Sequence, residues 1–303
     1  MYKNLSCDHL SITGRQSEII ELALTYGFQG IDIDMDDLAK RCERSSFESA
    51  SRFLLSSKLN AAGFDAPVNL DSDDEQFAKE LASLDSIAEI ANKCGSPVAI
   101  VKVPAATDRL PYPEYFEVVR KRVTEIAAKF DSQDVKVALA FSPQDASAED
   151  KQFKFVADTE GFCALVRAMT AKNVGIVFDS WDWHLGGGTV DSLKELGAEK
   201  VLSVVLGDCK EGVEAAAATD DDCLLPGSTG VIDNTGYLSA IASSGASLPV
   251  AARGMPAEGK ATRDALISKA QDGLDQCLTQ SGLETETRKP EDFVAPSYSR
   301  SAE

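Results

Sequence analysis

Hydrophobic residues gather in short runs that alternate with longer amphipathic stretches along most of this chain. The short runs are rich in Val, Ile, Leu and Ala without clean alternation, which is typical of strands covered on both faces. This pattern predicts eight strands. They lie at residues 4–10, 30–34, 64–70, 97–103, 135–141, 174–180, 201–208 and 247–253.

The stretches between these strands repeat apolar side chains every three or four positions, as amphipathic helices do. The clearest predicted helix covers residues 74–94 and is followed by Gly95 and Pro97, which are typical of a helix end. Similar patterns predict helices over 17–26, 113–130, 159–171 and 261–278.

Strand and helix alternate often enough for a (β/α)₈ arrangement. We therefore predict an α/β fold with a single TIM barrel over residues 1–281, and an open doubly wound sheet as the alternative. The polar, proline-containing segment 282–303 has no helical stripe. We expect it to be a tail that is disordered or lies over the surface.

Composition narrows the choice of partners and compartment. The chain carries 49 acidic and 30 basic side chains, a net charge of −19, which disfavours nucleic acid and anionic membranes as partners. No apolar run approaches the roughly 20 residues of a membrane span, and the first residues lack the apolar stretch of a signal peptide. Seven scattered cysteines without a C-x-x-C motif favour free thiols in a cytoplasmic protein. The oligomeric state stays open.

The segment 174–184 holds the densest candidate chemistry. An apolar strand ends at Asp179, and Trp181, Asp182 and His184 follow at once. Strand ends converge on one mouth of a barrel, where acids can hold Mg²⁺ or Mn²⁺ or transfer protons. An Asp in this position also commonly caps the next helix, so both interpretations stay open.

Three other strand ends carry candidates. Lys102 lies within an apolar strand, so it must reach the mouth or pair with an acid, and burial would suit it to nucleophilic or electrostatic roles. Asp208 closes another apolar run and is a candidate acid or base. Arg253 follows the last strand and could bind a carboxylate or phosphate.

Four sequence motifs together resemble a known family. They read YGFQGIDID at residues 26–34, FDSWDWH at 178–184, VVLGD at 204–208 and LLPGSTGVID at 224–233. They are similar to motifs of the xylose isomerase-like TIM barrels, a group of sugar phosphate isomerases and epimerases. The resemblance covers about residues 1–280 and supports the barrel prediction.

The resemblance also implies a site. Members bind one divalent metal through a Glu, an Asp, a His and a second Glu on four strand ends, and the glutamates move the proton. By position, Asp179 keeps the metal-binding Asp, whereas Ala140, Val205 and Arg253 replace the other three ligands. Asp182 stands where a substrate-contacting His belongs. We therefore expect no cofactor, unless ligands recruited elsewhere hold Mn or Mg.

The favoured hypothesis is a divergent barrel that binds a sugar or sugar acid. It assigns catalytic roles to Lys102, Asp182 and Asp208, substrate binding to His184, Arg253 and Trp181, and the surviving metal position to Asp179. A non-catalytic scaffold or regulatory binder is one alternative. An active isomerase or epimerase with recruited ligands is the other, so whether the chain is an enzyme stays open.

Overall fold

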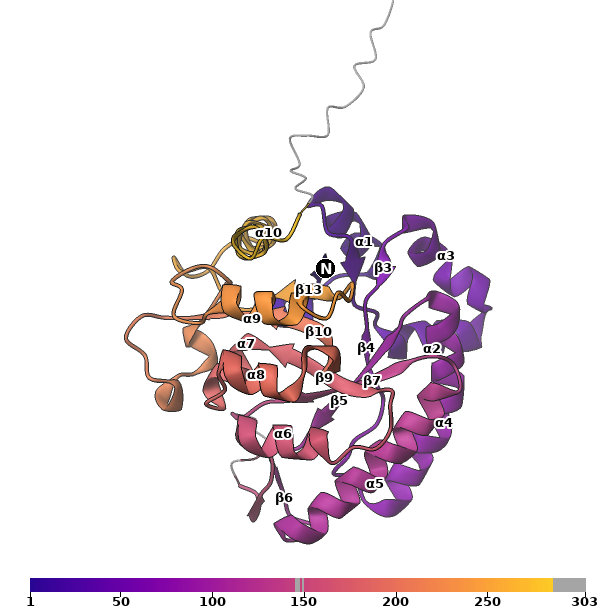
Figure 1. The fold of residues 1–303 in the computed structure, drawn as a ribbon. Coiled ribbons are helices and arrows are strands. Elements are labelled where there is room, and N and C mark those ends of the chain that lie inside the picture. Colours follow the sequence, from indigo (N-terminus) through magenta and orange to yellow (C-terminus); the bar gives the residue numbers. More distant parts are fainter. Residues whose placement is uncertain (145–147, 149, 286–303) are drawn as a thin grey trace, which may run out of the picture.

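The protein forms a closed barrel of parallel strands surrounded by helices (Figure 1). The structure is a computed structural model that describes residues 1–144, 148 and 150–285. Its main sheet has the strand order β3-β2-β1-β13-β10-β9-β7-β5-β4. The strands are β1 (Tyr2–Leu5), β2 (Gly30–Ile31), β3 (Asn60–Ala61), β4 (Phe64–Asp65), β5 (Val98–Val103), β7 (Lys136–Phe141), β9 (Val174–Asp179), β10 (Val201–Leu206) and β13 (Pro249–Ala252).

The barrel closes because β3 and β4 are two halves of one extended segment. Ala62 N donates to Ile31 O at 2.9 Å on the β2 side, and Ala66 N donates to Ile100 O at 2.8 Å on the β5 side. Counted as one strand, β3 and β4 complete the eight strands of a (β/α)₈ barrel. The predicted fold class is confirmed.

Helices cover the outside of the barrel. They are α1 (Gln16–Thr25), α2 (Met35–Arg44), α3 (Phe47–Ser57), α4 (Asp74–Cys94), α5 (Tyr112–Asp131), α6 (Thr159–Arg167), α7 (Ser180–Leu185), α8 (Val190–Leu196), α9 (Asn234–Ala242) and α10 (Arg263–Gln280). Several begin at a side chain that accepts a backbone N–H, such as Asp73, which bonds Gln76 N at 2.8 Å before α4. Their apolar faces join outward strand side chains in one large core.

A second, smaller cluster fills the inside of the barrel. It consists of Val98, Ala138, Val177, Leu202, Val205 and Ala251. Ile100 and Ala140 pack on this cluster but are only partly buried. Apolar side chains thus form a floor, and polar side chains at the strand ends lie above it.

Three predicted strands differ from the structure, and one of them, expected at residues 30–34, ends at Ile31. The first was expected at residues 4–10, but β1 ends at Leu5 and Asp8–Leu10 form a 3₁₀ turn, η1. The third was expected at 64–70, whereas the extended segment spans 60–65. Polar Asn60 and Asp65 and the central Gly63 hide this strand from hydrophobic patterning. The tail prediction for 286–303 falls outside the described residues.

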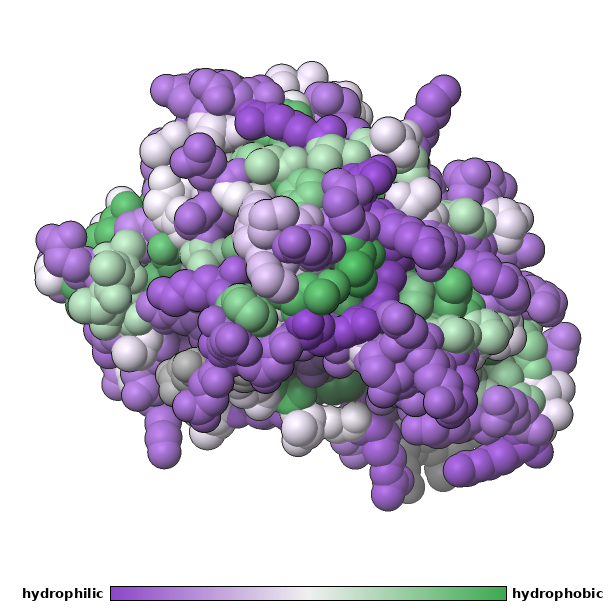
Figure 2. Space-filling model, turned by 90° about the horizontal axis from the view of Figure 1, so that it is seen from below, coloured by the Kyte–Doolittle hydropathy of each residue, from purple (hydrophilic) through white to green (hydrophobic). Residues whose placement is uncertain are grey.

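Two small antiparallel ladders lie beside the barrel sheet. One pairs β6 (Ala106–Thr107) with β8 (Phe153–Lys154), and the other pairs β11 (Asp208–Cys209) with β12 (Cys223–Leu224). Hydrophilic residues predominate on the face seen in Figure 2, and hydrophobic ones form separated patches. Within the described part of the chain, no helix has the length and apolarity needed to cross a bilayer. All seven cysteines are free thiols.

Candidate active site

Three of the predicted site residues meet in one ion-pair cluster. Arg253, just after β13, places its Nη1 atom 2.7 Å from Asp179 Oδ2 and 2.9 Å from Asp182 Oδ2. Asp179 ends β9, and Asp182 lies one turn into α7. Both aspartates are buried, and the Arg253 side chain is 19% exposed. A single guanidinium thus bridges two carboxylates at the C-terminal end of the barrel.

Every oxygen of the two carboxylates already accepts a hydrogen bond. Asp179 Oδ1 accepts from Trp181 N at 2.9 Å and from Asp182 N at 3.3 Å, and so caps α7. Asp182 Oδ1 accepts from Ser142 Oγ at 3.1 Å, and Arg253 occupies both Oδ2 atoms. Asp179 therefore has the capping role that the sequence left open, and the functional interpretation of both aspartates stays a prediction.

The cluster shifts the pKa values of its members. Burial and the Asp179 carboxylate raise the pKa of Asp182 to about 7, although Arg253 and Ser142 oppose the shift. Burial alone would lower the pKa of Arg253, but Asp179 and Asp182 raise it above its usual value. Arg253 is therefore always charged, and Asp182 can exchange a proton near neutral pH.

Apolar side chains on the barrel floor lie next to this cluster. Val205 on β10 pairs directly with Asp179 in the parallel register, and Ala140 lies on the inner face of β7. Among residues 1–144, 148 and 150–285, no three His, Cys, Asp or Glu side chains converge as a metal ion would need. The third hypothesis, recruited ligands, requires such a group.

Asp208 lies in a different environment. It is fully buried, and its carboxylate accepts backbone N–H groups from Thr229 and Gly230 at 2.8 Å each. Ile232 N and Cys209 N also donate to it, at 3.1 and 2.9 Å. Asp208 thus holds the loop before α9 against β11. These bonds engage both oxygens and leave little capacity for a substrate.

Replacing Asp208 with asparagine should lower the free energy of unfolding by about 2 kcal/mol, because an amide NH₂ would face backbone donors and leave at least one unsatisfied. Urea denaturation at pH 7 measures the change. Asp233→Asn is the matched control, since Asp233 only caps α9 through Gly236 N and asparagine caps equally well. Equal losses in the two variants would contradict this account of Asp208.

Lys102 reaches the mouth on the opposite wall. Its Nζ atom lies 2.9 Å from Asp65 Oδ2, and the two side chains are 78% and 54% exposed. The sequence required Lys102 to reach the mouth or pair with an acid, and it does both. Its exposure removes the burial on which the proposed nucleophilic role depended.

Trp181 and His184 belong to α7, the helix that Asp179 caps. Trp181 is fully buried and His184 is half-buried, and neither Trp181 Nε1 nor His184 Nε2 has a hydrogen-bond partner. Burial lowers the pKa of His184, so its imidazole is neutral at pH 7. Direct contact with a sugar would require either ring to become more accessible.

A further acid at the mouth was missed from the sequence. Asp32 follows β2 and accepts a hydrogen bond from Asn4 Nδ2 at 2.8 Å. The expected strand end was Asp34, which instead caps α2 by accepting from Asp37 N at 2.9 Å. The signal was available, because Asp32 lies within the YGFQGIDID motif of residues 26–34 on which the family resemblance partly rests.

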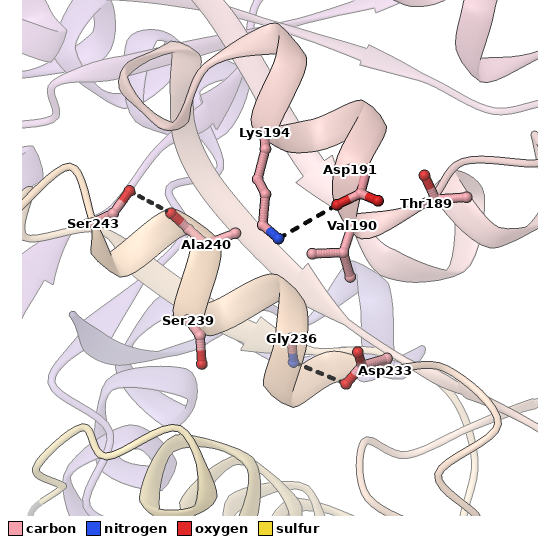
Figure 3. A pocket seen from close by; sticks show the side chains of 9 residues that line it. All are labelled: Thr189, Val190, Asp191, Lys194, Asp233, Gly236, Ser239, Ala240 and Ser243. Atoms are coloured by element: carbon pink, nitrogen blue, oxygen red, sulfur yellow. Dashed lines mark hydrogen bonds and ion pairs between the residues drawn. The ribbon is translucent and has the colours of Figure 1, made fainter.

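A cavity of about 770 Å³ lies away from the mouth, between α8 and α9 (Figure 3). Its charged lining includes Asp191 and Lys194, which are exposed and pair with each other at 3.4 Å. Asp233 on the same wall caps α9. These groups serve local structure and bring no buried acid or base to the cavity, so we place the site at the barrel mouth.

Comparison with known proteins decides the family. The model of the xylose isomerase-like TIM barrel family matches residues 20–276. This chain belongs to that family. A curated relative from Bacillus velezensis named inosose isomerase is 28% identical over 227 residues, which cover 73% of this chain and 77% of the relative. An inosose isomerase of Bacillus subtilis is 29% identical over 145 residues, 47% of this chain and 48% of that protein.

Solved structures share the fold. A xylose isomerase domain protein from Alicyclobacillus acidocaldarius superposes with a TM-score of 0.80 at 22% identity, covering 93% of this chain and 99% of that one. The IolI protein, crystallised with a zinc atom, gives a TM-score of 0.76 at 21% identity, with coverages of 93% and 99%. At these identities the structures support the barrel and carry no assignment of individual residues.

Proposed function

We propose that this barrel binds a polyhydroxylated, sugar-like ketone at its mouth without a divalent metal. The observation that carries the proposal is the position of Arg253, whose guanidinium bridges Asp179 and Asp182. Two relatives are named inosose isomerases, and inosose is a cyclic ketone that carries several hydroxyls. A ligand of that class needs hydrogen-bond donors and acceptors more than fixed charges.

The side chains do not fit the metal that zinc-containing IolI suggests. Asp179 offers no unused oxygen, because Oδ1 caps α7 and Oδ2 accepts from Arg253. Val205 beside it has no lone pair to donate. A permanent positive charge within 3 Å would also repel a cation. We therefore derive no chemical step through a metal.

Arg253 is suited to replace the cation in ligand binding. A guanidinium carries five N–H donors, more than its two carboxylate contacts use, and the side chain is partly accessible. The Arg253 Nη2 atom is 3.7 Å from Asp220 Oδ1, too far for a good hydrogen bond. It can therefore turn to a carbonyl or hydroxyl oxygen of the ligand.

Calorimetry with inosose tests the proposal. After EDTA treatment, the protein should bind inosose with an unchanged Kd, and Arg253→Lys should weaken binding about tenfold because an ammonium group cannot contact both aspartates and the ligand as the planar guanidinium does. Arg120→Lys is the matched control, since Arg120 pairs with Glu117 on the exposed face of α5. Binding that disappears with EDTA and returns with Mn²⁺ or Zn²⁺ would overturn the proposal.

A further inference from the structure

A second polar group faces the barrel interior on the β1–β2 side. Asp32 accepts a hydrogen bond from Asn4 Nδ2 at 2.8 Å, and the Ser6 side chain also lowers the pKa of Asp32. The neighbouring Ile31 belongs to the outer core, so the alternation of side chains turns Asp32 inward. Asp32 keeps partial solvent access, whereas Asn4 and Ser6 are buried. This carboxylate is thus held in one orientation from below.

Asn4 leaves one acceptor without a partner. The residue is 2% exposed, and its Oδ1 atom has no hydrogen bond. Its amide orientation is fixed, because Nδ2 must face the acceptor Asp32. Oδ1 lies close to Gly30, and a Cβ atom added to that glycine would be 3.1 Å from Asn4 Oδ1. Buried acceptors rarely stay unpaired, so this part of the interior is built to meet a hydroxyl or a water.

The charges around Asp32 suit it to hold a proton. Burial raises its pKa, and Asp65 adds to the rise, whereas Ser6, Asn4 and His9 oppose it. Asp65 is itself paired with Lys102. Tyr2 on β1 and Cys7 in the turn after it are further neighbours, and burial, with a contribution from Asp32, raises the pKa of both. No cation lies in direct ion-pair contact with Asp32 among the described residues.

Asp32 and Arg253 stand on either side of β1. Asn4 pairs with Gly30 on one side and with Ala251 on the other. Asp32 follows Gly30 by two residues, and Arg253 follows Ala251 by two residues. Both residues therefore lie at the same height along the barrel axis. Two strand spacings, about 10 Å, separate the backbones of the two residues, so that Asp32 and Arg253 approach the mouth from different strands.

We propose that Asp32 is the proton-transferring group of this mouth, acting on a polyhydroxy ketone whose carbonyl oxygen binds Arg253. This inference rests on the proposed function. The C–H bond next to the carbonyl breaks, its proton moves to the Asp32 carboxylate, and its electron pair forms the C=C bond of an enediolate. Negative charge develops on the former carbonyl oxygen beside Arg253. Return of a proton from Asp32 to the same face of that carbon restores the ketone, without another reactant.

Deuterium exchange tests this assignment. EDTA-treated full-length protein is incubated with inosose in D₂O, and loss of the C–H signal next to the carbonyl is followed by proton NMR. Wild-type protein should exchange this proton, and Asp32→Asn should slow exchange at least about 100-fold. The Kd for inosose should change less than about threefold, because asparagine still accepts from Asn4. Asp34→Asn is the control, since Asp34 caps α2 outside the mouth.

The outcomes separate this inference from the function on which it rests. Exchange at the wild-type rate in Asp32→Asn overturns the role of Asp32. Binding of inosose without exchange by wild-type protein also overturns it, while the proposed binding function stands. Failure to bind inosose overturns both. Should Asp32→Asn not fold, Asp32→Glu keeps the charge but displaces the carboxylate by one methylene, and exchange should slow at least about tenfold.

Discussion

Replacing Arg253 with leucine should lower the free energy of unfolding by about 3–5 kcal/mol at pH 7. The substitution leaves Asp179 and Asp182 buried beside each other without their counter-ion. Asp182 can reduce the cost by taking up a proton, since its pKa is already about 7. The loss should therefore be larger at pH 8 than at pH 6, because the remaining carboxylate charges are less easily neutralised at the higher pH.

Urea denaturation of wild type and Arg253→Leu at the two pH values measures this effect. Arg120→Leu is the matched control, because it breaks an exposed ion pair on α5 and should cost less than about 1 kcal/mol. Adding Asp182→Asn to Arg253→Leu should recover part of the loss by removing one unpaired charge. A loss no larger than that of the control would contradict the structural role of the cluster.

Three substitutions should create a metal site in this barrel. Ala140→Glu, Val205→His and Arg253→Glu supply the ligands that the family resemblance implies, and Asp179 supplies the fourth. Val205 already pairs with Asp179, and Ala140 lies on the same inner surface. The triple variant should bind Zn²⁺ or Mn²⁺ at least about 1,000-fold more tightly than wild type, a gain of about 4 kcal/mol. Calorimetry measures both affinities.

The control for this design is the triple variant with Asp179→Asn added. Asparagine retains the size of aspartate but loses its charge, so affinity for the divalent ion should fall again. Circular dichroism establishes that each variant is folded before titration. A folded triple variant with wild-type affinity would show that these four positions do not surround one point, and the alignment behind the proposed function would then be wrong.

The barrel could be predicted because its signals are local. The expected helix over 74–94 coincides with α4, where Asp73 caps the start and Gly95, at φ 70°, ends it. The apolar strands β5, β7, β9 and β10 are each six residues long and lie within the predicted ranges. The interrupted β3–β4 strand lacks these signals, because two short pieces with exposed Asn60 and Asp65 resemble a loop.

Only one rule predicted part of the site, namely that the C-terminal ends of barrel strands converge on one mouth. That rule placed Asp179, Asp182 and Arg253 at one mouth, but the two ion pairs span 74 and 71 residues of sequence and follow from packing alone. The predicted end of the second strand was Asp34, two residues beyond Asp32, so the prediction overlooked Asp32. Strand alternation puts both on one side, and only the cap of α2 removes Asp34 from the mouth.

Asp208 is a residue whose structural role could not be predicted from the sequence. Closing an apolar strand gave it the appearance of a catalytic acid, and nothing local revealed that the loop of residues 229–232 would supply three of its four donors. Such a carboxylate and a catalytic one occupy the same kind of position in sequence. They differ only in which donors the fold brings to their oxygens.

Metal content beside Asp179 is the most direct measurement of the central idea, that a guanidinium replaces the family's cation. The protein is produced in medium supplemented with Mn²⁺ and Zn²⁺, purified without chelator, analysed by inductively coupled plasma mass spectrometry and crystallised for anomalous diffraction. We expect far less than one ion per chain and Arg253 in contact with Asp179. One tightly held ion per chain, with an anomalous peak at Asp179 and Arg253 displaced, would contradict the account.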